Sequence, residues 1–551
     1  MKLTKRIFAA MLALCLLLTL VPAAFAQGTG GNCGINGDNV KWSYDDNGHL
    51  RITGTGDMRA YTEDYCAPWY KYSDYIVSVV IDPDVTGIGD YAFYWCDKLT
   101  SVTIPDSVTS IGGYAFYCCK ALTGITIPNS VTNIGESAFA NCTALTSVVI
   151  PGSVTCIGEH AFDYCTELTS VTIQDGVESI GARAFYLCYK LEDIAIDGIV
   201  ASIGKNVFES TAYYDDDANW ENGVLYIGKC LIVADHSIAD EYTVKSGTKT
   251  IADEAFLYCA SLTGITLPDG IVYIGDNAFN DCHNLTGIEI PKSVAHIGNN
   301  AFYNCVDLTD ISVADGNVAY YSENGILYNN AKTEIIRFPS KKADTSFTIP
   351  DGVTGIADGA FDNCRNLTGI TIPDSAASIG DSAFANCFGL TEITIPDGVA
   401  SIGNSAFYQC TALTDVTIPI SITSIGNNAF LDCDKLNKVY YIGTENDWRN
   451  IIKGNKYSIA DSIIHYCSGI SAKRSDDGKI IVKPITDTGK TVILALYDGE
   501  KGNRFIEIQS EIYNGAEITF TPTQNYTLAK VMIWKSLDSL SSVCDYRTLK
   551  N

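Results

Sequence analysis

The sequence predicts a solenoid of 23-residue repeats that is rich in β-structure, with a parallel sheet along one side and short helical or 3₁₀ corners. Two observations support it: a phenylalanine that recurs at a constant step along the chain, and an alternation of apolar and polar residues ahead of it. Two longer steps, from Phe208 to Phe256 and from Phe302 to Phe361, interrupt the period and mark two insertions. The recurring phenylalanines are Phe93, Phe116, Phe139, Phe162, Phe185, Phe208, Phe256, Phe279, Phe302, Phe361, Phe384, Phe407 and Phe430.

Residues 1–26 are typical of a secretory signal peptide. Basic residues precede an apolar run over residues 7–20, and Ala24-Phe25-Ala26 is a small-residue cleavage site. The apolar run is short for a spanning helix, so cleavage is favoured over the alternative of a membrane anchor. We therefore expect a mature chain without a membrane span that is secreted, either free or held at the cell surface.

Residues 27–75 lack the repeat and are predicted to form an N-terminal cap, because a solenoid must shield its first coil. Residues 40–44 and 50–52 flank the turn residues Asp45-Asp46-Asn47-Gly48, a pattern that predicts a hairpin. An independent binding module is the alternative interpretation of this segment.

One repeat shows how a coil of the predicted solenoid, residues 76–469, is built. Residues 122–127 alternate apolar and polar side chains, which predicts a strand with one buried face. Val131 and Ile134 are expected to point inward from a second extended piece. Gly135 is expected to permit a tight bend, and residues 138–142 to form the short helical or 3₁₀ corner.

The two insertions lie near residues 209–245 and 314–347, and each contains Glu-Asn-Gly-x-Leu-Tyr. This shared motif predicts one specialised hairpin that is used twice. The aromatic residues of the insertions are candidates for ligand binding, because tyrosine and tryptophan combine a large apolar surface with a polar group. Packing of an enlarged coil is the equally weighted alternative. The candidates are Tyr213, Tyr214, Trp220, Tyr226, Tyr320, Tyr321 and Tyr328.

Residues 470–551 carry no repeat and are predicted to form a small β-sandwich-like domain. Their apolar segments are separated by polar turns that contain Asp-Gly or Asn-Gly. The expected strands cover residues 479–483, 491–497, 505–508, 517–520 and 530–534.

Twelve of the twenty cysteines lie three residues after a recurring phenylalanine. Equivalent positions stack in a solenoid at a spacing that disulfides tolerate, but their side chains point in the same direction. We therefore expect small buried hydrophobic residues rather than disulfides. Cys33 with Cys66, and Cys467 with Cys544, are better disulfide candidates. The twelve are Cys96, Cys119, Cys142, Cys165, Cys188, Cys259, Cys282, Cys305, Cys364, Cys387, Cys410 and Cys433.

The composition argues against several classes of partner and chemistry. A formal charge of −27 disfavours nucleic acid and anionic membrane surfaces. The sequence contains no Gly-x-Ser-x-Gly elbow, no phosphate-binding Walker loop and no His-Glu-x-x-His motif. Its six histidines are isolated, which argues against zinc, and Asp215-Asp216-Asp217 lacks the spaced ligands of a calcium loop. We expect no enzyme activity, no cofactor and no metal.

The repeated elements Leu-Thr-x-Ile-x-Ile-Pro and Ile-Gly-x-x-Ala-Phe-x-x-Cys resemble the BspA-like leucine-rich repeats of bacterial surface and secreted proteins. The resemblance covers roughly residues 76–469, and residues 446–450 and 463–466 resemble the family's closing cap. It implies a leucine-rich repeat solenoid that binds an extracellular protein or glycan, or mediates adhesion. A passive scaffold that displays the C-terminal domain, and an enzyme with its site in the tail, are the alternatives.

Overall fold

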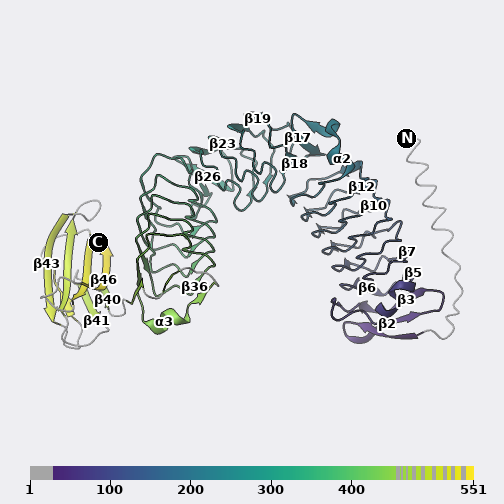
Figure 1. Cartoon of the computed structure of the whole chain (residues 1–551), viewed down its shortest axis with the longest axis horizontal. Coiled ribbons are helices and arrows are strands. Elements are labelled where there is room, and N and C mark those ends of the chain that lie inside the picture. Colours follow the sequence, from purple (N-terminus) through teal and green to yellow (C-terminus); the bar gives the residue numbers. More distant parts are fainter. Residues whose placement is uncertain are drawn as a thin grey trace. The chain divides into compact units, whose positions relative to one another are not determined.

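The computed structural model describes residues 29–454, 459–460, 463–466, 470–474, 480–484, 491–498, 504–512, 518–522, 528–534 and 542–550 (Figure 1). The predicted signal peptide lies outside these residues. The chain divides into two compact units, Met1–Glu221 with Leu225–Ile232, and Asn222–Val224 with Val233–Asn551. None of the described helices is long and apolar enough to cross a membrane.

The first unit begins with an antiparallel sheet of β1 (Thr29–Gly34), β2 (Gly37–Tyr44) and β3 (His49–Gly54). The predicted hairpin is confirmed, because β2 pairs with β3 across the expected turn. β3 then pairs in parallel with the first strand of the solenoid, β5 (Ser78–Ile81). The segment also contains β4 (Gly56–Asp57) and η1 (Tyr70–Tyr75). The indole of Trp69 stacks on Phe93 at 5.9 Å, so an aromatic ring covers the first phenylalanine of the repeat.

Two ladders of short parallel strands run along the coils of this unit, and paired strands are one repeat apart in the sequence. The parallel sheet predicted from the repeat is confirmed. The first ladder contains β5, β7 (Ser101–Thr103), β10 (Ser147–Ile150), β12 (Ser170–Ile173) and β14 (Asp193–Ile196). The second contains β6 (Val85–Ile88), β8 (Ser110–Ile111), β9 (Asn133–Ile134), β11 (Cys156–Ile157), β13 (Ser179–Ile180) and β15 (Ser202–Ile203).

The coil analysed from the sequence departs from prediction at its first strand. Residues 122–127 form no strand, although Leu122 and Ile127 are buried and Thr126 is exposed as predicted. The ladder is interrupted here, and the next coil contacts this one through a hydrogen bond from the Thr146 N–H to the Thr123 carbonyl at 3.2 Å. The burial pattern was therefore predicted correctly except at Ile125, which is half-buried, and the strand was not.

The predicted helical or 3₁₀ corners are wrong, because the chain forms consecutive turns there instead. Ser137 and Asn141, on either side of Phe139, have φ of 52° and 61°. A left-handed residue at two positions in five prevents a helix from propagating. The N–H groups of Ser137, Phe139 and Asn141 donate to carbonyls of the next coil at 2.8, 2.7 and 2.7 Å. The corner thus adds a third ladder of hydrogen bonds between coils.

Gly135 has a different role from the predicted tight bend. Its φ is not positive, and a Cβ added to it would lie 2.4 Å from the backbone nitrogen of Gly113 in the preceding coil. The glycine of the Ile-Gly motif is therefore required by the close approach of two coils.

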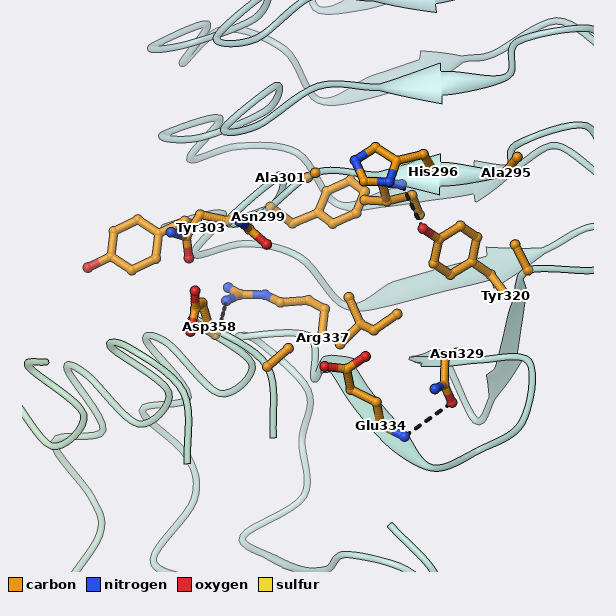
Figure 2. A pocket seen from close by; sticks show the side chains of 18 residues that line it. Ala295, His296, Asn299, Ala301, Tyr303, Tyr320, Asn329, Glu334, Arg337 and Asp358 are labelled. Carbon is orange, nitrogen blue, oxygen red and sulfur yellow. Dashed lines mark hydrogen bonds between the residues drawn. The ribbon is translucent and has the colours of Figure 1, made fainter. Parts of the chain in front are cut away.

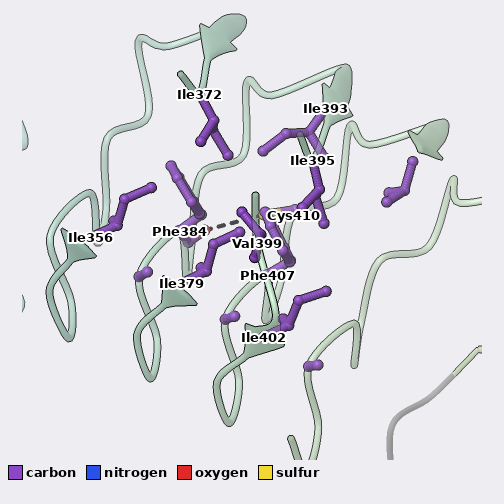
Figure 3. Close-up of a cluster of buried hydrophobic side chains, with 14 of the residues drawn as sticks. Ile356, Ile372, Ile379, Phe384, Ile393, Ile395, Val399, Ile402, Phe407 and Cys410 are labelled. Atoms are coloured by element: carbon purple, nitrogen blue, oxygen red, sulfur yellow. Dashed lines mark hydrogen bonds between the residues drawn. The ribbon is translucent and has the colours of Figure 1, made fainter. Parts of the chain in front are cut away.

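The recurring phenylalanines form continuous stacks in the core, with ring centroids 5.1–5.5 Å apart from Phe93 to Phe208. Figure 3 shows the same arrangement in the second unit, where Phe384 and Phe407 lie among buried isoleucines. Phe338 also belongs to the phenylalanine stack of the second unit, although the repeat spacing did not identify it. It lies one repeat before Phe361 and stacks on it at 5.3 Å.

The twelve cysteines of the repeat are buried free thiols, as predicted. The sequence did not predict that most of them also donate a hydrogen bond. The Cys142 Sγ, for example, donates to the carbonyl of Phe116 at 3.2 Å, and the Cys410 Sγ donates to that of Phe384 at the same distance (Figure 3). Burial raises the pKa of Cys305 and of Cys387 to about 12.

The candidate disulfide between Cys33 and Cys66 does not form, because both are free thiols. Cys33 is buried, whereas the Cys66 Sγ donates to the Glu63 carbonyl at 3.2 Å. The other candidate pair, Cys467 and Cys544, lies outside the side chains that the structure describes.

The first insertion contains α2 (Ala212–Asp215), η2 (Asp217–Asn219), β16 (Trp220–Glu221), β17 (Val224–Ile227) and β18 (Cys230–Ala234). The second unit continues with two ladders. One contains β19 (Glu241–Thr243), β21 (Gly264–Thr266), β23 (Gly287–Ile290), β25 (Asp310–Val313), β29 (Ser346–Thr348), β31 (Gly369–Thr371), β33 (Glu392–Thr394), β35 (Asp415–Ile418), β37 (Lys438–Tyr441) and β39 (Ile464–Tyr466). The other contains β20 (Thr250–Ile251), β22 (Tyr273–Ile274), β24 (His296–Ile297), β28 (Glu334–Arg337), β30 (Gly355–Ile356), β32 (Ser378–Ile379), β34 (Ser401–Ile402), β36 (Ser424–Ile425) and β38 (Ile452–Lys453).

The last coils are covered by α3 (Glu445–Asn450), which begins with a capping box between Thr444 and Asp447. Its Trp448 is buried against Tyr441, with ring centroids 5.1 Å apart. This arrangement agrees with the closing cap implied by the resemblance.

Beyond residue 469, the described residues form two antiparallel sheets. One contains β40 (Ile470–Arg474), β41 (Ile480–Pro484) and β44 (Ile518–Phe520). The other contains β43 (Arg504–Ile512), β42 (Thr491–Asp498), β45 (Leu528–Trp534) and β46 (Ser542–Lys550). All five predicted strands are present, and β40 and β46 were missed. The packing of the two sheets into a sandwich stays a prediction.

Candidate functional site

The regular stack of the second unit is interrupted at the second insertion. In the ladder that contains β24 and β28, strand pairing stops at β24 and starts again with the hairpin β26 (Tyr320–Glu323) and β27 (Ile326–Asn329), which pairs with β28. The hairpin turns at Asn324 and Gly325, whose φ angles of 53° and 77° suit a two-residue type I′ turn. The predicted hairpin is therefore confirmed in the second insertion. Asn222 and Gly223 of the first insertion have similar angles, 53° and 80°.

A pocket of about 310 Å³ lies at this interruption (Figure 2). Residues 295–303 line it from the last regular coil, and residues 357–359 line it from the coil that follows. Tyr320, Glu334 and Arg337 line it from the hairpin sheet between them. The pocket therefore exists because the hairpin replaces part of a coil.

Arg337 is the most constrained side chain of the pocket and is only 3% exposed. Its guanidinium donates through Nη1 to the Gly359 carbonyl, and through Nη2 to the Ser340 Oγ at 2.7 Å and the Asp362 carbonyl at 3.2 Å. Its Nε has no hydrogen-bond partner. Figure 2 shows the side chain extending with its guanidinium toward Asp358. One donor of a buried guanidinium thus remains unsatisfied at the pocket.

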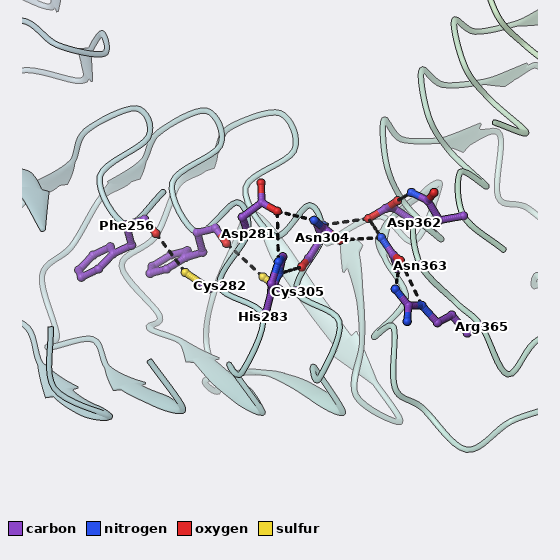
Figure 4. Close-up of polar contacts among 11 residues, drawn as sticks. Phe256, Asp281, Cys282, His283, Asn304, Cys305, Asp362, Asn363 and Arg365 are labelled. Carbon is purple, nitrogen blue, oxygen red and sulfur yellow. Dashed lines mark hydrogen bonds and ion pairs between the residues drawn. The ribbon is translucent and has the colours of Figure 1, made fainter. Parts of the chain in front are cut away.

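Asp362 is the other charged residue that the described part of the chain buries. Its carboxylate accepts hydrogen bonds from the Asn304 N–H at 2.9 Å, the Asn363 Nδ2 at 3.0 Å and the Asn386 Nδ2 at 3.1 Å (Figure 4). Burial raises the pKa of Asp362, while the charge of Arg337 and these hydrogen bonds oppose the shift.

The carboxylate of Asp362 replaces a backbone acceptor. In the preceding regular coil the Asp281 N–H donates to the Tyr303 carbonyl of the next coil at 3.0 Å. Asn304 occupies the equivalent position one coil later, where the hairpin follows, and donates to Asp362 instead. Its side-chain amide donates back to the Asp281 Oδ1 (Figure 4). Asp362 therefore joins the two regular blocks across the interruption.

The charges that line the pocket are mixed. Glu334 is half-buried, and burial together with the nearby charge of Asp358 raises its pKa. Tyr320 accepts a hydrogen bond from the Ile297 N–H at 2.6 Å, and burial raises its pKa too. Two carboxyl groups thus face the pocket together with the guanidinium of Arg337, which leaves it weakly acidic.

The structure places the predicted aromatic candidates in different environments. Tyr320 lines the pocket, and the half-buried ring of Tyr321 has the Lys332 Nζ 4.0 Å from its centroid. Tyr226 and Tyr328, at equivalent positions of the shared motif, are only 6% and 3% exposed. For these two residues the burial favours the alternative of core packing.

The other three candidates lie together in the first insertion. The rings of Tyr214 and Trp220 meet edge to face at 5.3 Å, and the Trp220 Nε1 donates to the Tyr214 carbonyl at 2.8 Å. The hydroxyl of Tyr213 donates to the Tyr226 carbonyl at 3.3 Å. All three are half-buried, so each keeps some surface available for contact.

Sequence reasoning missed Arg337, Asp362 and the pocket itself. Two features of the sequence indicate that the repeat is altered here. Phe338 lies one period before Phe361, although it lacks the preceding Ile-Gly-x-x-Ala. Ala357 replaces the glycine of the motif in the coil that follows the second insertion, and Ala252 replaces it after the first.

The acidic turn of the first insertion serves as a helix cap, since the Asp216 carboxylate accepts from the Ala218 N–H at 3.0 Å. Within the described ranges no group of three or more histidine, cysteine, aspartate or glutamate side chains is placed to hold a metal ion.

Comparison with known proteins gives a family and a set of similar structures. The model of the BspA type leucine-rich repeat region matches six copies over residues 70–215, 249–345 and 337–453. A leucine-rich cell surface protein of Faecalibacterium prausnitzii A2-165 is similar, with 27% identity over 78% of this chain and 99% of its own, and a TM-score of 0.36. A leucine-rich repeat protein of Eubacterium ventriosum ATCC 27560 has 24% identity over 75% and 85%, with a TM-score of 0.28. The pneumococcal vaccine antigen PcpA has 16% identity over 78% and 92%, with a TM-score of 0.37. No curated protein matches.

Proposed function

Since the chain belongs to the BspA-type leucine-rich repeat family, we propose that it is a secreted or surface-associated, non-catalytic protein that binds an extracellular protein or glycan and so mediates attachment. The observation that carries the proposal is the interruption of the stack at the second insertion. The pocket there combines a buried guanidinium with an unpartnered donor, two carboxyl groups and a tyrosine.

The side chains of the regular coils also support placing the binding site in the insertions. Their outward strand positions carry small or polar side chains such as Ser101, Thr103 and Thr266, all exposed. Side chains of this kind rarely anchor a partner, whereas aromatic residues and arginine often do. Recognition is therefore proposed to lie in the insertions, with the repeats as a rigid support.

A passive scaffold is the second candidate, and the two antiparallel sheets beyond residue 469 favour it. In this version the solenoid spaces a C-terminal β-sandwich from the cell, and the sandwich makes the contact.

The test is a binding screen of the full secreted chain against immobilised matrix proteins and glycans. Saturable binding that a soluble competitor displaces supports recognition by this protein. A binding signal that rises linearly with protein concentration on every immobilised surface contradicts this proposal. The passive scaffold would then be the remaining candidate. Turnover of a substrate panel in the same preparation would contradict the non-catalytic assignment.

A further inference from the structure

We propose that the pocket at the second insertion receives a lysine side chain of a partner protein, with the ammonium group beside Glu334 and Asp358 and the aliphatic stem against Ile336 and Tyr320. This inference rests on the proposed function and names the partner chemistry of the same site. All four side chains line the pocket and are half-buried, so a ligand can contact each of them.

The alternation of β28 separates Glu334 from Arg337. Ile335 and Arg337 point into the core, whereas Glu334 and Ile336 lie on the other face of the strand and remain half-buried at the pocket. The guanidinium of Arg337 donates to two carbonyls and one hydroxyl. The buried positive charge therefore does not pair with the carboxylate that faces the pocket.

The carboxyl group of Glu334 has no cation beside it. In the part of the chain that the structure describes, no residue donates a hydrogen bond to this group or forms an ion pair with it, and burial and the nearby carboxylate of Asp358 raise its pKa. Asp358 accepts from the Asp381 N–H at 2.7 Å, a neutral donor that leaves its charge uncompensated. Lys332 of the same hairpin pairs with Glu323 instead, at 3.5 Å. Two uncompensated carboxylates at one pocket favour a cationic ligand.

The rest of the accessible wall fits the stem of a lysine. Ile336 and Tyr320 supply apolar surface beside the carboxylates. A lysine buries its aliphatic stem along such a surface while its charged end meets a polar group, and an aromatic ring also attracts an ammonium group. The pocket volume of about 310 Å³ lies at the lower end of small-molecule sites, about 300–1,000 Å³, which suits the entry of one side chain.

The two carboxylates come from different elements, Glu334 from β28 and Asp358 from the coil that follows (Figure 2). A compact ammonium group has three donors that can rotate toward both of them. The planar guanidinium of an arginine matches a single carboxylate side-on and is less suited to this arrangement.

A side chain, rather than a peptide strand, is the part of the partner that enters. Strand addition would need free backbone groups along the edge of β24. The Ile297 N–H of that edge already donates to the hydroxyl of Tyr320 at 2.6 Å. The hairpin has therefore closed the edge that an extended peptide would use.

The experiment titrates Nα-acetyl-lysine methylamide into the full chain and follows binding by ligand-observed NMR. Because His296 also lines the pocket, the titration is made at about pH 8, where histidine side chains are ordinarily uncharged. The matching norleucine compound has the same stem without the ammonium group and is expected to bind at least about tenfold more weakly. Absence of saturable binding by the lysine compound, or equal binding by the norleucine compound, overturns the proposal.

Three variants test the location. Glu334→Gln keeps the shape of the side chain, removes its charge and is expected to weaken lysine binding by about tenfold. Asp358→Asn keeps the acceptor of the Asp381 N–H, removes the second charge and is expected to weaken binding as well. Glu323→Gln is the matched control, because Glu323 is exposed on the same hairpin outside the pocket. It changes the net charge by the same amount and is expected to leave binding unchanged.

The outcomes separate this inference from the proposed function. Equal lysine binding by the Glu334→Gln variant and the parent chain overturns the pocket assignment, even if the chain still adheres to a surface in the binding screen. Lysine binding that Glu334→Gln weakens and Glu323→Gln preserves supports the pocket, even if the chain adheres to no surface and the attachment role falls.

Discussion

The ring of Phe139 stacks on the ring of Phe162 in the next coil, with centroids 5.1 Å apart and planes inclined by 9°. Both rings are fully buried, and each belongs to a stack that continues from Phe93 to Phe208 in the first unit. A change at one rung therefore removes contacts with two neighbouring coils.

Phe139→Ala is expected to lower the free energy of unfolding by about 3–5 kcal/mol, because it leaves a cavity that neighbouring coils cannot fill. Thr126→Ala, at an exposed position of the same coil, is expected to stay within about 0.5 kcal/mol. Guanidinium denaturation of both variants measures the difference. Equal destabilisation would mean that the inward and outward assignment is wrong.

The thiols of the repeat are expected to resist alkylation in the native protein. All twelve are buried, so the reagent has no access to them, and burial also raises the pKa of thiols such as Cys142, Cys305 and Cys387, which leaves little of the reactive thiolate. Mass spectrometry after iodoacetamide treatment should find the twelve unmodified, and denaturation without reductant should release them. Cys66 is only half-buried and serves as the internal control, with faster labelling expected. Recovery of consecutive repeat cysteines as cross-linked peptides would contradict the assignment.

The same pKa shifts predict a loss of stability at alkaline pH. A cysteine in the unfolded chain ionises near pH 8.5, whereas Cys305 and Cys387 in the folded chain have pKa values of about 12. Between these values the unfolded state releases protons that the folded state retains, so stability is full below about pH 8.5 and falls as pH rises. Denaturation at a series of pH values should show this slope, and Cys387→Ala should make it shallower. A slope that Cys387→Ala leaves unchanged would assign the alkaline loss to other groups, such as the buried tyrosines.

Asp362→Ala is expected to destabilise the second unit by about 3–5 kcal/mol, since it leaves the charge of Arg337 without its buried counterpart. It also removes the acceptor of the Asn304 N–H and of two asparagine amides. Asp381→Ala is the matched control, because Asp381 is exposed and its carboxylate accepts from Asn404 alone. The control should cost no more than about 1 kcal/mol. Similar losses for both variants, measured by chemical denaturation, would show that Asp362 does not join the two blocks.

Much of the fold could be predicted from the sequence because a repeat multiplies each local signal. The constant step between phenylalanines predicted the parallel ladders, and the pattern around Phe139 predicted the buried and exposed positions. The corners could not be predicted in the same way. Their left-handed φ angles fall on residues as different as Tyr114, Ser137 and Arg183, so the conformation depends on hydrogen bonds to the next coil rather than on residue type.

The candidate site was predicted only in part, because it arises where the repeat fails. The sequence identified the second insertion and Tyr320 as candidates but did not identify Arg337. The burial of Arg337 depends on its hydrogen bonds to two carbonyls and one hydroxyl of three later residues. The fold explains why alanine can replace the glycine of the motif at Ala357. Regular coils approach too closely for a Cβ at this position, whereas Ala357 follows a hairpin strand and lines the pocket.

Two aromatic residues of the insertions, Trp220 and Tyr321, are expected to bind the partner found in the binding screen. Trp220 and Tyr321 belong to the insertions and remain half-buried, so each combines a fixed orientation with some accessible surface. Trp220→Ala and Tyr321→Ala are each expected to weaken binding by about tenfold, the usual effect of removing an aromatic anchor. Trp95→Ala is the matched control, because Trp95 is 40% exposed but lies on a regular coil, and its loss should leave affinity unchanged. Surface plasmon resonance on the three variants, each first shown to unfold at the same temperature as the parent chain, measures the contrast. If Trp95→Ala weakens binding and the two insertion variants do not, the face of the regular coils is the binding surface and the insertions are only structural.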